Sequence, residues 1–109
     1  MSKSILHNKQ EGTCWLCKKL YQDSSRRTGL EEHHALMGTQ YRKLSEHYGL
    51  KVYLCPEHHR IGKEAVHSNI EICRLVQREA QKAFEARYSH EKWMEVFGRN
   101  FLQPFGKKD

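Results

Sequence analysis

The spacing of hydrophobic residues predicts helices in three parts of the chain. From position 69 to about 87, apolar side chains recur at every third or fourth position on one stripe: Ile72, Val76, Ala80 and Phe84. Ser68 and Glu71 have the spacing of a capping box, which predicts that this long helix begins at about Asn69. A shorter helix is predicted over 40–48, before Gly49, and another begins after Ser89 and ends at Gly98.

Two short segments, 30–37 and 52–54, are predicted to be strands, and the first is expected to end at Gly38. The terminal segments show no such periodicity. We therefore expect a flexible lead at 1–11, one domain at 12–103, and a flexible basic tail at 104–109. Helices combined with a small number of strands predict an α+β fold.

Charge and length restrict the class of protein without deciding it. The chain has 109 residues and a formal net charge of +6, which favours a polyanionic partner such as nucleic acid. No segment approaches the roughly 20 consecutive apolar residues of a membrane span, and the first ten residues lack the apolar run of a signal peptide. We expect a cytoplasmic protein with no membrane partner, in which cysteines more often bind metal than form disulfides.

Two pairs of soft ligands have the spacing of a structural zinc site. Cys14 and Cys17 form one pair, and Cys55 and His58 form the other. Each pair is separated by two residues, so that a single turn can direct both side chains to one Zn²⁺ ion. Cys73 is the rival fourth ligand, although it falls within a helical pattern, where a lone cysteine is more often a small core residue.

The remaining histidines are too concentrated to be ordinary core residues. Six of the eight histidines lie between His33 and His67, and two pairs are adjacent in the sequence, at 33–34 and 58–59. Adjacent side chains on an extended or turning chain point in different directions, so that one of each pair can face a metal while the other faces elsewhere.

These motifs resemble those of the HNH, or ββα-metal (His-Me finger), nucleases. The resemblance rests on Cys14-x-x-Cys17, Glu32-His33-His34, Leu54-Cys55-x-x-His58-His59 and Val66-His67-x-Asn69, and spans residues 13–101. More narrowly, the pattern is similar to that of phage-borne recombination-enhancement, RecA-dependent nucleases. The resemblance implies a small zinc-stapled ββα-metal domain with a C-terminal helical extension. It also implies a metal-dependent DNA endonuclease or nickase of phage DNA recombination or processing.

The resemblance assigns roles to individual residues. His34 would be the general base that activates water, His33 and His59 would bind a catalytic divalent metal, Mg²⁺ or Mn²⁺, and His67 would complete the metal site, with Asn69 as the competing choice. The central Asn that orients the base in this family has no counterpart between positions 38 and 54. Gln40 or Tyr41 occupies that region instead.

Four basic residues are expected to contact nucleic acid: Arg42, Lys43, Arg60 and Lys63. The expected partner is single- or double-stranded DNA, with a recombinase filament as a further candidate. The alternative is a non-catalytic, zinc-stabilised DNA-binding or adaptor module, which would need none of His33, His34 and His59. A zinc deaminase would require a His-x-Glu motif with Pro-Cys-x-x-Cys, and the chain lacks this pair.

Overall fold

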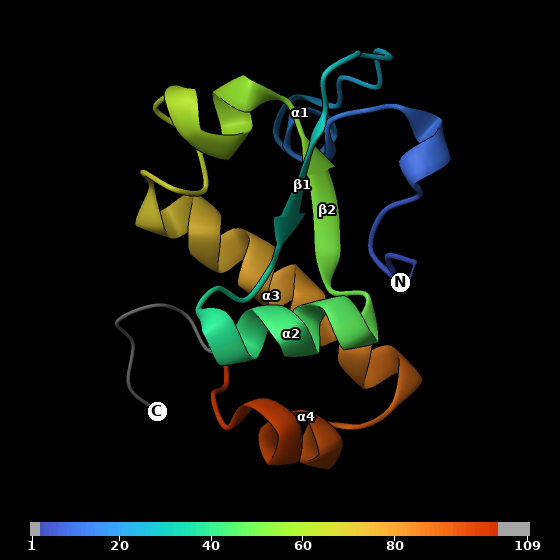
Figure 1. The fold of residues 1–109 in the computed structure, drawn as a ribbon, viewed down its shortest axis with the longest axis vertical. Helices are drawn as coiled ribbons and strands as arrows, with labels where there is room; N and C mark the ends of the chain where they lie inside the picture. Colours follow the sequence, from blue (N-terminus) through green and yellow to red (C-terminus); the bar gives the residue numbers. More distant parts are fainter. Residues whose placement is uncertain (1–2, 103–109) are drawn as a thin grey trace.

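The computed structural model describes residues 3–102, which form an α+β domain around a two-stranded sheet (Figure 1). In chain order the elements are η1 (Lys9–Glu11), α1 (Trp15–Tyr21), β1 (Glu31–His34), α2 (Thr39–Tyr48), β2 (Lys51–Leu54), η2 (Glu57–Ile61), α3 (Ile70–Arg87) and α4 (His90–Phe97). The predicted α+β class is confirmed. Within residues 3–102, no helix combines the length and apolarity needed to cross a lipid bilayer.

The two strands pair antiparallel and lie side by side at the centre of the domain (Figure 1). Their register pairs Glu31 with Leu54, Glu32 with Tyr53, His33 with Val52, and His34 with Lys51. Successive side chains of a strand point to opposite faces, so Glu31 and His33 share one face of β1, whereas Glu32 and His34 share the other. Strand alternation therefore separates the two adjacent histidines.

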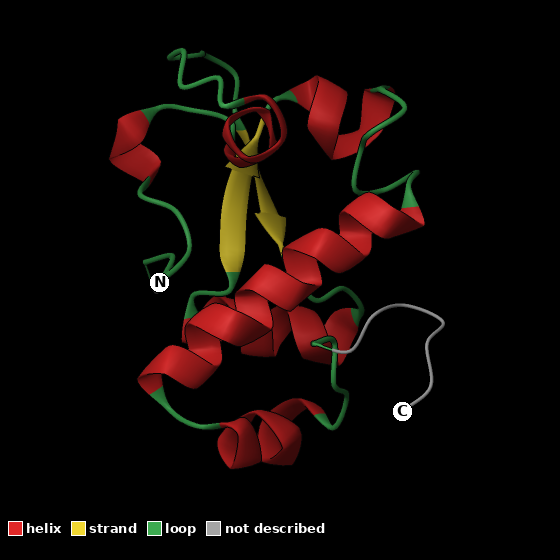
Figure 2. Cartoon of the chain, turned by 180° about the vertical axis from the view of Figure 1, so that it is seen from behind, coloured by secondary structure: helices red, strands yellow, loops and turns green. Residues whose placement is uncertain are grey.

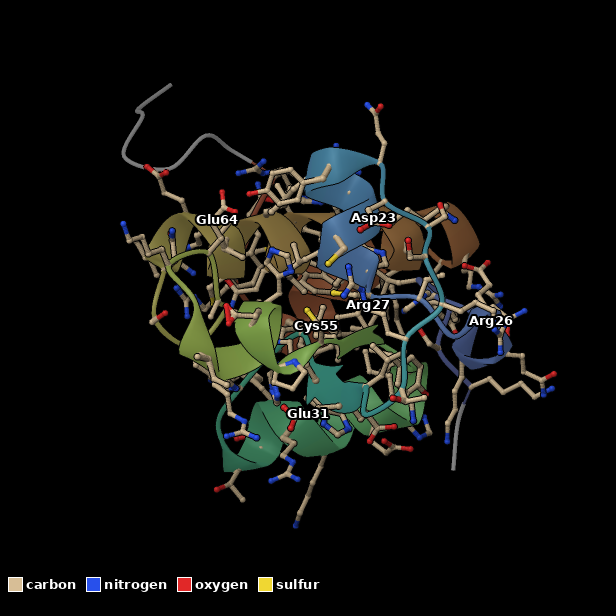
Figure 3. All side chains as sticks on the ribbon, turned by 90° about the horizontal axis from the view of Figure 1, so that it is seen from above. Asp23, Arg26, Arg27, Glu31, Cys55 and Glu64 are labelled. Atoms are coloured by element: carbon tan, nitrogen blue, oxygen red, sulfur yellow. The ribbon has the colours of Figure 1, made fainter. Side chains whose placement is uncertain are left out.

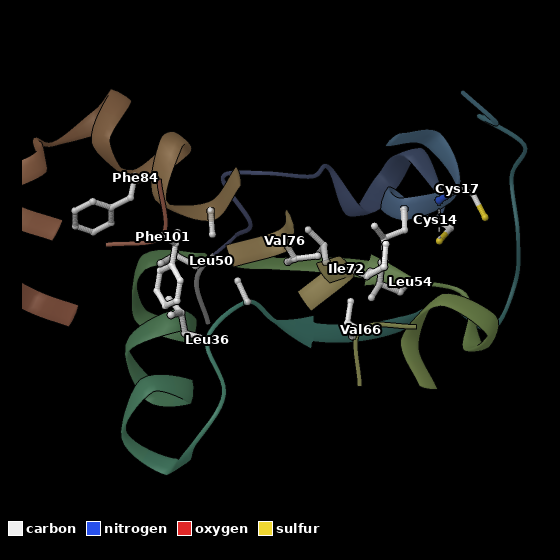
Figure 4. Packing of buried hydrophobic residues seen from close by; sticks show 14 of the residues in the cluster. Cys14, Cys17, Leu36, Leu50, Leu54, Val66, Ile72, Val76, Phe84 and Phe101 are labelled. Carbon is white, nitrogen blue, oxygen red and sulfur yellow. Dashed lines mark hydrogen bonds between the residues drawn. The ribbon is translucent and has the colours of Figure 1, made fainter. Parts of the chain in front are cut away.

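The long helix α3 runs diagonally across the sheet and supplies one wall of the core (Figure 2). Its predicted apolar stripe is buried, and Ile72 and Val76 lie in the same hydrophobic cluster as Leu54 of β2 (Figure 4). Burial of an aliphatic or aromatic side chain of this size contributes about 1.5–3 kcal/mol. Cys14 and Cys17 lie at the Leu54 end of this core (Figure 4), so the cysteine cluster and the apolar core form one continuous interior.

The start of α3 differs from the predicted capping box. Oδ1 of Asn69 accepts hydrogen bonds from the backbone N–H groups of Glu71 and Ile72, at 3.0 and 3.3 Å. Ser68 instead donates its hydroxyl to the carbonyl oxygen of Gly62, at 3.2 Å. Asn69 is thus the N-cap, and the helix begins one residue later, at Ile70.

The C-terminal helix α4 has the predicted bounds. Ser89 caps it by accepting the N–H of Lys92 at 3.0 Å, and Gly98 ends it in the left-handed conformation. Trp93 and Phe97 of α4 pack with ring centroids 4.2 Å apart, and both are buried. The helix thereby closes the end of the core opposite the cysteine cluster (Figure 1).

Several segments differ from their predicted conformation. Residues 3–11, which we expected to be a flexible lead, pack against the domain: Ile5 donates its N–H to Gly49, and the His7 ring is buried beside Tyr53. The helix α1 was not among the predicted helices, and the first strand, predicted over 30–37, is confined to 31–34. The short helical turn η2 was also not predicted. The basic tail predicted at 104–109 lies outside the described residues.

Candidate metal centres

Three cysteines and one histidine from two segments form a buried cluster at the end of β2. Cys14 is the N-cap of α1 and Cys17 lies in its first turn, whereas Cys55 directly follows β2 and His58 lies in η2. None of the four residues is more than 8% exposed. The structure therefore brings together the four predicted zinc ligands. Cys73 is buried separately in α3 and takes no part in the cluster.

The separations within this cluster are those of ligands around one ion. Nδ1 of His58 lies 3.8, 3.3 and 3.5 Å from the sulfur atoms of Cys14, Cys17 and Cys55, and the sulfurs of Cys17 and Cys55 are 3.9 Å apart. With Zn–S bonds of about 2.3 Å and Zn–N bonds of about 2.0 Å, the edges of a tetrahedral site are about 3.5–3.8 Å. The cluster could therefore hold a zinc ion.

The electrostatics of the cluster favour a cation. Burial, followed by the neighbouring thiol of Cys14, raises the pKa of Cys17 to about 12. Several thiolates cannot share a buried space unless a positive charge offsets their repulsion. A zinc ion would supply that charge, and four protein ligands would leave no position open, as in a closed structural site.

Three imidazoles form a second cluster: His33 from β1, His59 from η2, and His67 from the segment before α3. The ring centroids of His33 lie 5.3 Å from His59 and 5.2 Å from His67, and those of His59 and His67 are 4.7 Å apart. Nε2 of His59 and Nε2 of His67 are separated by 3.1 Å. The structure thus places together the three predicted histidine ligands, which could hold a metal ion.

His33 is the deepest member of this cluster. It is 3% exposed, and its Nε2 is the one buried side-chain nitrogen or oxygen among residues 3–102 that lacks a hydrogen-bond partner. Burial, followed by the nearby rings of His59 and His67, lowers the pKa of His33 to about 3. A buried, neutral imidazole with an unused nitrogen fits a metal ligand, because coordination would satisfy that nitrogen.

Glu31 binds the ring nitrogen of His59 that does not face His67. Nδ1 of His59 lies 2.7 Å from one oxygen of Glu31, and Arg60 binds both oxygens of the same carboxylate, at 2.7 and 3.2 Å. The hydrogen bond from Arg60, followed by that from His59, lowers the pKa of Glu31 to about 2. A carboxylate in this position fixes the tautomer in which Nδ1 donates, and this directs the lone pair of Nε2 into the cluster. Figure 3 views this end of the molecule from above, with Glu31 and Cys55 labelled.

His34 lies apart from its neighbour His33, as strand alternation requires. Its Nε2 is 2.9 Å from a carboxylate oxygen of Glu46, which belongs to α2. The ammonium group of Lys51 lies 3.1 Å from both Glu46 and Glu32. Glu32, His34 and Glu46 form a third group of closely spaced potential metal ligands. The ammonium group of Lys51, however, already contacts both of its carboxylates.

A single cavity connects the histidine cluster with His34. All four histidines, 33, 34, 59 and 67, line a space of about 340 Å³ together with Arg42. His34 and Arg42 also line an adjoining space of about 530 Å³, where Lys43 joins them. The structure thus places Arg42 and Lys43 beside the predicted base. Lys63 is exposed but lines neither space, and Arg60 is held by Glu31.

No protein-family model, curated protein or solved structure matches the chain. The function must therefore be inferred from the chemistry of the two centres and of the cavity between His34 and Arg42.

Three residues that contact the predicted site were not predicted from the sequence. Glu31 could have been found, because it lies two residues before His33 and a strand places both on one face. Glu46 and Lys51 gave no such signal, since their contact with His34 depends on how α2 packs against the sheet.

The side chains of Asn69, Gln40 and Tyr41 all lie outside the candidate site. The amide oxygen of Asn69 caps α3 and its amide nitrogen binds the carbonyl of Lys63, so the side chain is committed outside the histidine cluster. Among the described residues, neither candidate for the missing Asn forms a hydrogen bond with His34. Gln40 is exposed, and the hydroxyl of Tyr41 donates to the carbonyl of Phe97 at 2.9 Å.

Proposed function

We propose that this protein is a metal-dependent nuclease of the HNH type that hydrolyses phosphodiester bonds in DNA. The observation that carries the proposal is the division of the adjacent pair His33 and His34. His33 belongs to a three-imidazole cluster, His34 is held separately by a carboxylate, and both line one cavity. Phosphodiester hydrolysis needs such a pair of functions, a metal and an uncoordinated base within reach of one phosphate.

His34 serves as the general base. Its Nε2 is engaged by Glu46, which leaves Nδ1 as the nitrogen with a free lone pair. A water oxygen forms a new bond to phosphorus while its proton moves to Nδ1 of His34. The bond from phosphorus to the leaving oxygen breaks, and that oxygen takes up a proton from solvent. His33 cannot replace His34 as the base when its nitrogen is occupied by coordination.

His33, His59 and His67 are the residues that would hold the divalent ion. Such an ion stabilises the negative charge that develops on the phosphate and the leaving oxygen. The separation of 3.1 Å between Nε2 of His59 and Nε2 of His67 fits neighbouring ligand positions, which are about 3.0 Å apart for bonds of about 2.1 Å in an octahedron. Imidazole binds first-row transition metals better than magnesium, so of the two expected ions Mn²⁺ fits this ligand set better.

DNA is the substrate that the surrounding charges favour. The chain carries a net charge of +6, and Arg42 lies on the wall of both spaces beside His34. A guanidinium group at this position can bind the phosphate that is cleaved or its neighbour by two parallel hydrogen bonds. Contacts of this kind position the backbone without selecting a sequence.

The test compares wild type with His34→Ala and with His90→Ala as a matched control. His90 is a histidine of α4 whose partner is Glu85, and it belongs to neither centre. Each protein is brought to equal zinc content and incubated with supercoiled plasmid or single-stranded DNA and Mn²⁺ or Mg²⁺. We expect wild type and His90→Ala to nick or cut the DNA, and His34→Ala to be at least 100-fold slower.

Two outcomes would contradict the proposal. Equal cleavage by His34→Ala and wild type would exclude His34 as the base. Binding of DNA without cleavage by any of the proteins would instead favour the non-catalytic zinc-stabilised module.

A further inference from the structure

The contacts around His34 extend beyond the one hydrogen bond with Glu46 that the catalytic proposal uses. His34 ends β1, Lys51 begins β2 directly opposite it, and Glu46 approaches both from α2. Nε2 of His34 is 2.9 Å from Oε1 of Glu46, and the ammonium of Lys51 is 3.1 and 3.2 Å from the two oxygens of Glu46. Glu32 completes the set, 3.1 Å from Lys51.

We propose that Glu46 is a positioning residue that fixes the ring orientation and tautomer of His34, and that Lys51 is a built-in cation that holds Glu46 in place. The catalytic part of this inference rests on the proposed nuclease function, whereas the positioning itself does not.

Glu46 can fix the tautomer because a carboxylate accepts hydrogen bonds but does not donate them. The nitrogen that faces it must therefore carry the proton, and the lone pair is placed on Nδ1. The same hydrogen bond prevents rotation of the ring, which would otherwise exchange the two nitrogens. No asparagine lies between positions 38 and 54 to orient the base. Glu46 of α2 supplies the orienting hydrogen bond instead.

Lys51 gives this carboxylate a fixed geometry. Its side chain is 2% exposed, so its ammonium group has little access to water and depends on Glu46 and Glu32 for hydrogen bonds. Burial alone would lower the pKa of Lys51, but the hydrogen bonds that its ammonium group donates to the two carboxylates outweigh burial, and the pKa is raised. The lysine thus remains charged and occupies the space between the carboxylates.

The same ammonium group argues against a third metal site. Glu32, His34 and Glu46 have ligand atoms within 4.8 Å of one another, as metal ligands do. A divalent cation bound there would lie close to the ammonium group of Lys51, which contacts both carboxylates at 3.1 Å, and the two positive charges would repel. With neutral His34, two carboxylates and one ammonium group leave the set with a single net negative charge, which suits an orienting partner better than a metal site.

The experiment reads the tautomer of His34 directly. Long-range ¹H–¹⁵N NMR of the imidazoles is recorded for wild type, Glu46→Ala, Glu46→Gln and the remote control Glu95→Ala, and His34→Gln assigns the His34 signal. Glu95 is an exposed residue of α4, outside the set. The same samples are assayed for metal content and for the kcat and KM of DNA cleavage. Glu46→Gln preserves the side-chain volume and an acceptor oxygen, so it remains informative if Glu46→Ala does not fold.

We expect wild type and Glu95→Ala to carry the His34 proton on Nε2. Glu46→Gln should keep part of this preference, and Glu46→Ala should show both tautomers. The kcat should fall in the same order, by about 10-fold or more for Glu46→Ala, while KM and metal content stay within 2-fold of wild type.

Three results would overturn the inference: a His34 proton on Nδ1 in wild type, an unchanged tautomer in Glu46→Ala, or the loss of one metal equivalent when Glu46 is replaced. If wild type does not cleave DNA but the tautomer changes as expected, the positioning role stands and the nuclease proposal fails.

Discussion

The two candidate metal centres use adjacent residues of the same short element, yet they differ in their access to solvent. His58 belongs to the cysteine cluster and His59 to the histidine cluster. All four residues of the cysteine cluster are buried, whereas His67 of the histidine cluster is exposed and the cluster opens into a cavity of about 340 Å³. A closed centre can only stabilise the fold, but an open one can also present an ion to a substrate.

The local geometry of η2 makes this division possible. The chain forms a wide turn in which Gly62 donates its N–H to the carbonyl of Glu57, five residues earlier. The turn directs successive side chains to different sides, as strand alternation does for His33 and His34. Such wide turns occur frequently at functional sites. In both places a pair of neighbouring histidines is divided between two different roles.

Loss of a cysteine ligand should have the largest effect. Cys17→Ala removes one of the four ligands of the buried cluster, and binding of a structural zinc is worth about 10–16 kcal/mol, comparable with or larger than the total stability of a domain. We expect loss of the cooperative thermal transition observed by circular dichroism. Cys73→Ala is the control, because Cys73 is as well buried but belongs to no cluster, and it should cost only about 1 kcal/mol. Equal destabilisation by the two variants would contradict a structural metal at the first centre.

Removal of a histidine ligand should abolish the second centre without unfolding the protein. His67→Ala leaves the core intact because the side chain is exposed, but it deprives the cluster of one of its three imidazoles. Isothermal titration should show binding of Mn²⁺ weakened by more than about 100-fold, the upper end of the loss expected for a supporting residue, with the zinc content and melting temperature close to wild type. His90→Ala should bind Mn²⁺ as wild type does. Unchanged Mn²⁺ binding in His67→Ala would show that the ion binds elsewhere.

The carboxylate behind His59 should have a smaller effect. Glu31→Ala removes the acceptor of the Nδ1 proton of His59, so the ring is free to turn, and the affinity for Mn²⁺ should fall about 10–100-fold. Arg60→Ala leaves the bond between Glu31 and His59 in place, and should therefore weaken Mn²⁺ binding less. A greater loss of Mn²⁺ affinity in Arg60→Ala than in Glu31→Ala would contradict the role of Glu31 in orienting His59.

The smallest effect is expected at the DNA contact. Arg42→Gln removes one positive charge beside His34 and should reduce the salt dependence of DNA binding by about one unit of the logarithmic slope. Lys92→Gln removes the same charge from α4, where the side chain pairs with Glu95 away from both centres. Fluorescence anisotropy over a range of salt concentrations measures both. A larger change for Lys92→Gln would place the DNA on another surface.

Sequence alone was sufficient where the signal is local. The long helix and its apolar stripe follow from the spacing of Ile72, Val76, Ala80 and Phe84. The two pairs of candidate zinc ligands could be recognised because the residues of each pair are spaced so that one turn can present both. Alternation along β1 was enough to predict that His33 and His34 point apart.

Contacts between distant segments could not be predicted in this way. Glu46 and Lys51 reach His34 only because α2 packs against the sheet, and His7 is buried only because residues 3–11 fold back onto β2. At the start of α3, Ser68 and Asn69 were both suitable caps. The choice between them was made by the competing hydrogen bond from Ser68 to Gly62.

Anomalous diffraction from crystals grown with Mn²⁺, recorded at the zinc edge and at a wavelength where manganese scatters anomalously, tests the division of roles most directly. We predict zinc between Cys14, Cys17, Cys55 and His58, manganese between His33, His59 and His67, and no ion between His34 and Glu46. A manganese peak at His34 and Glu46, or none at the three imidazoles, would contradict the account.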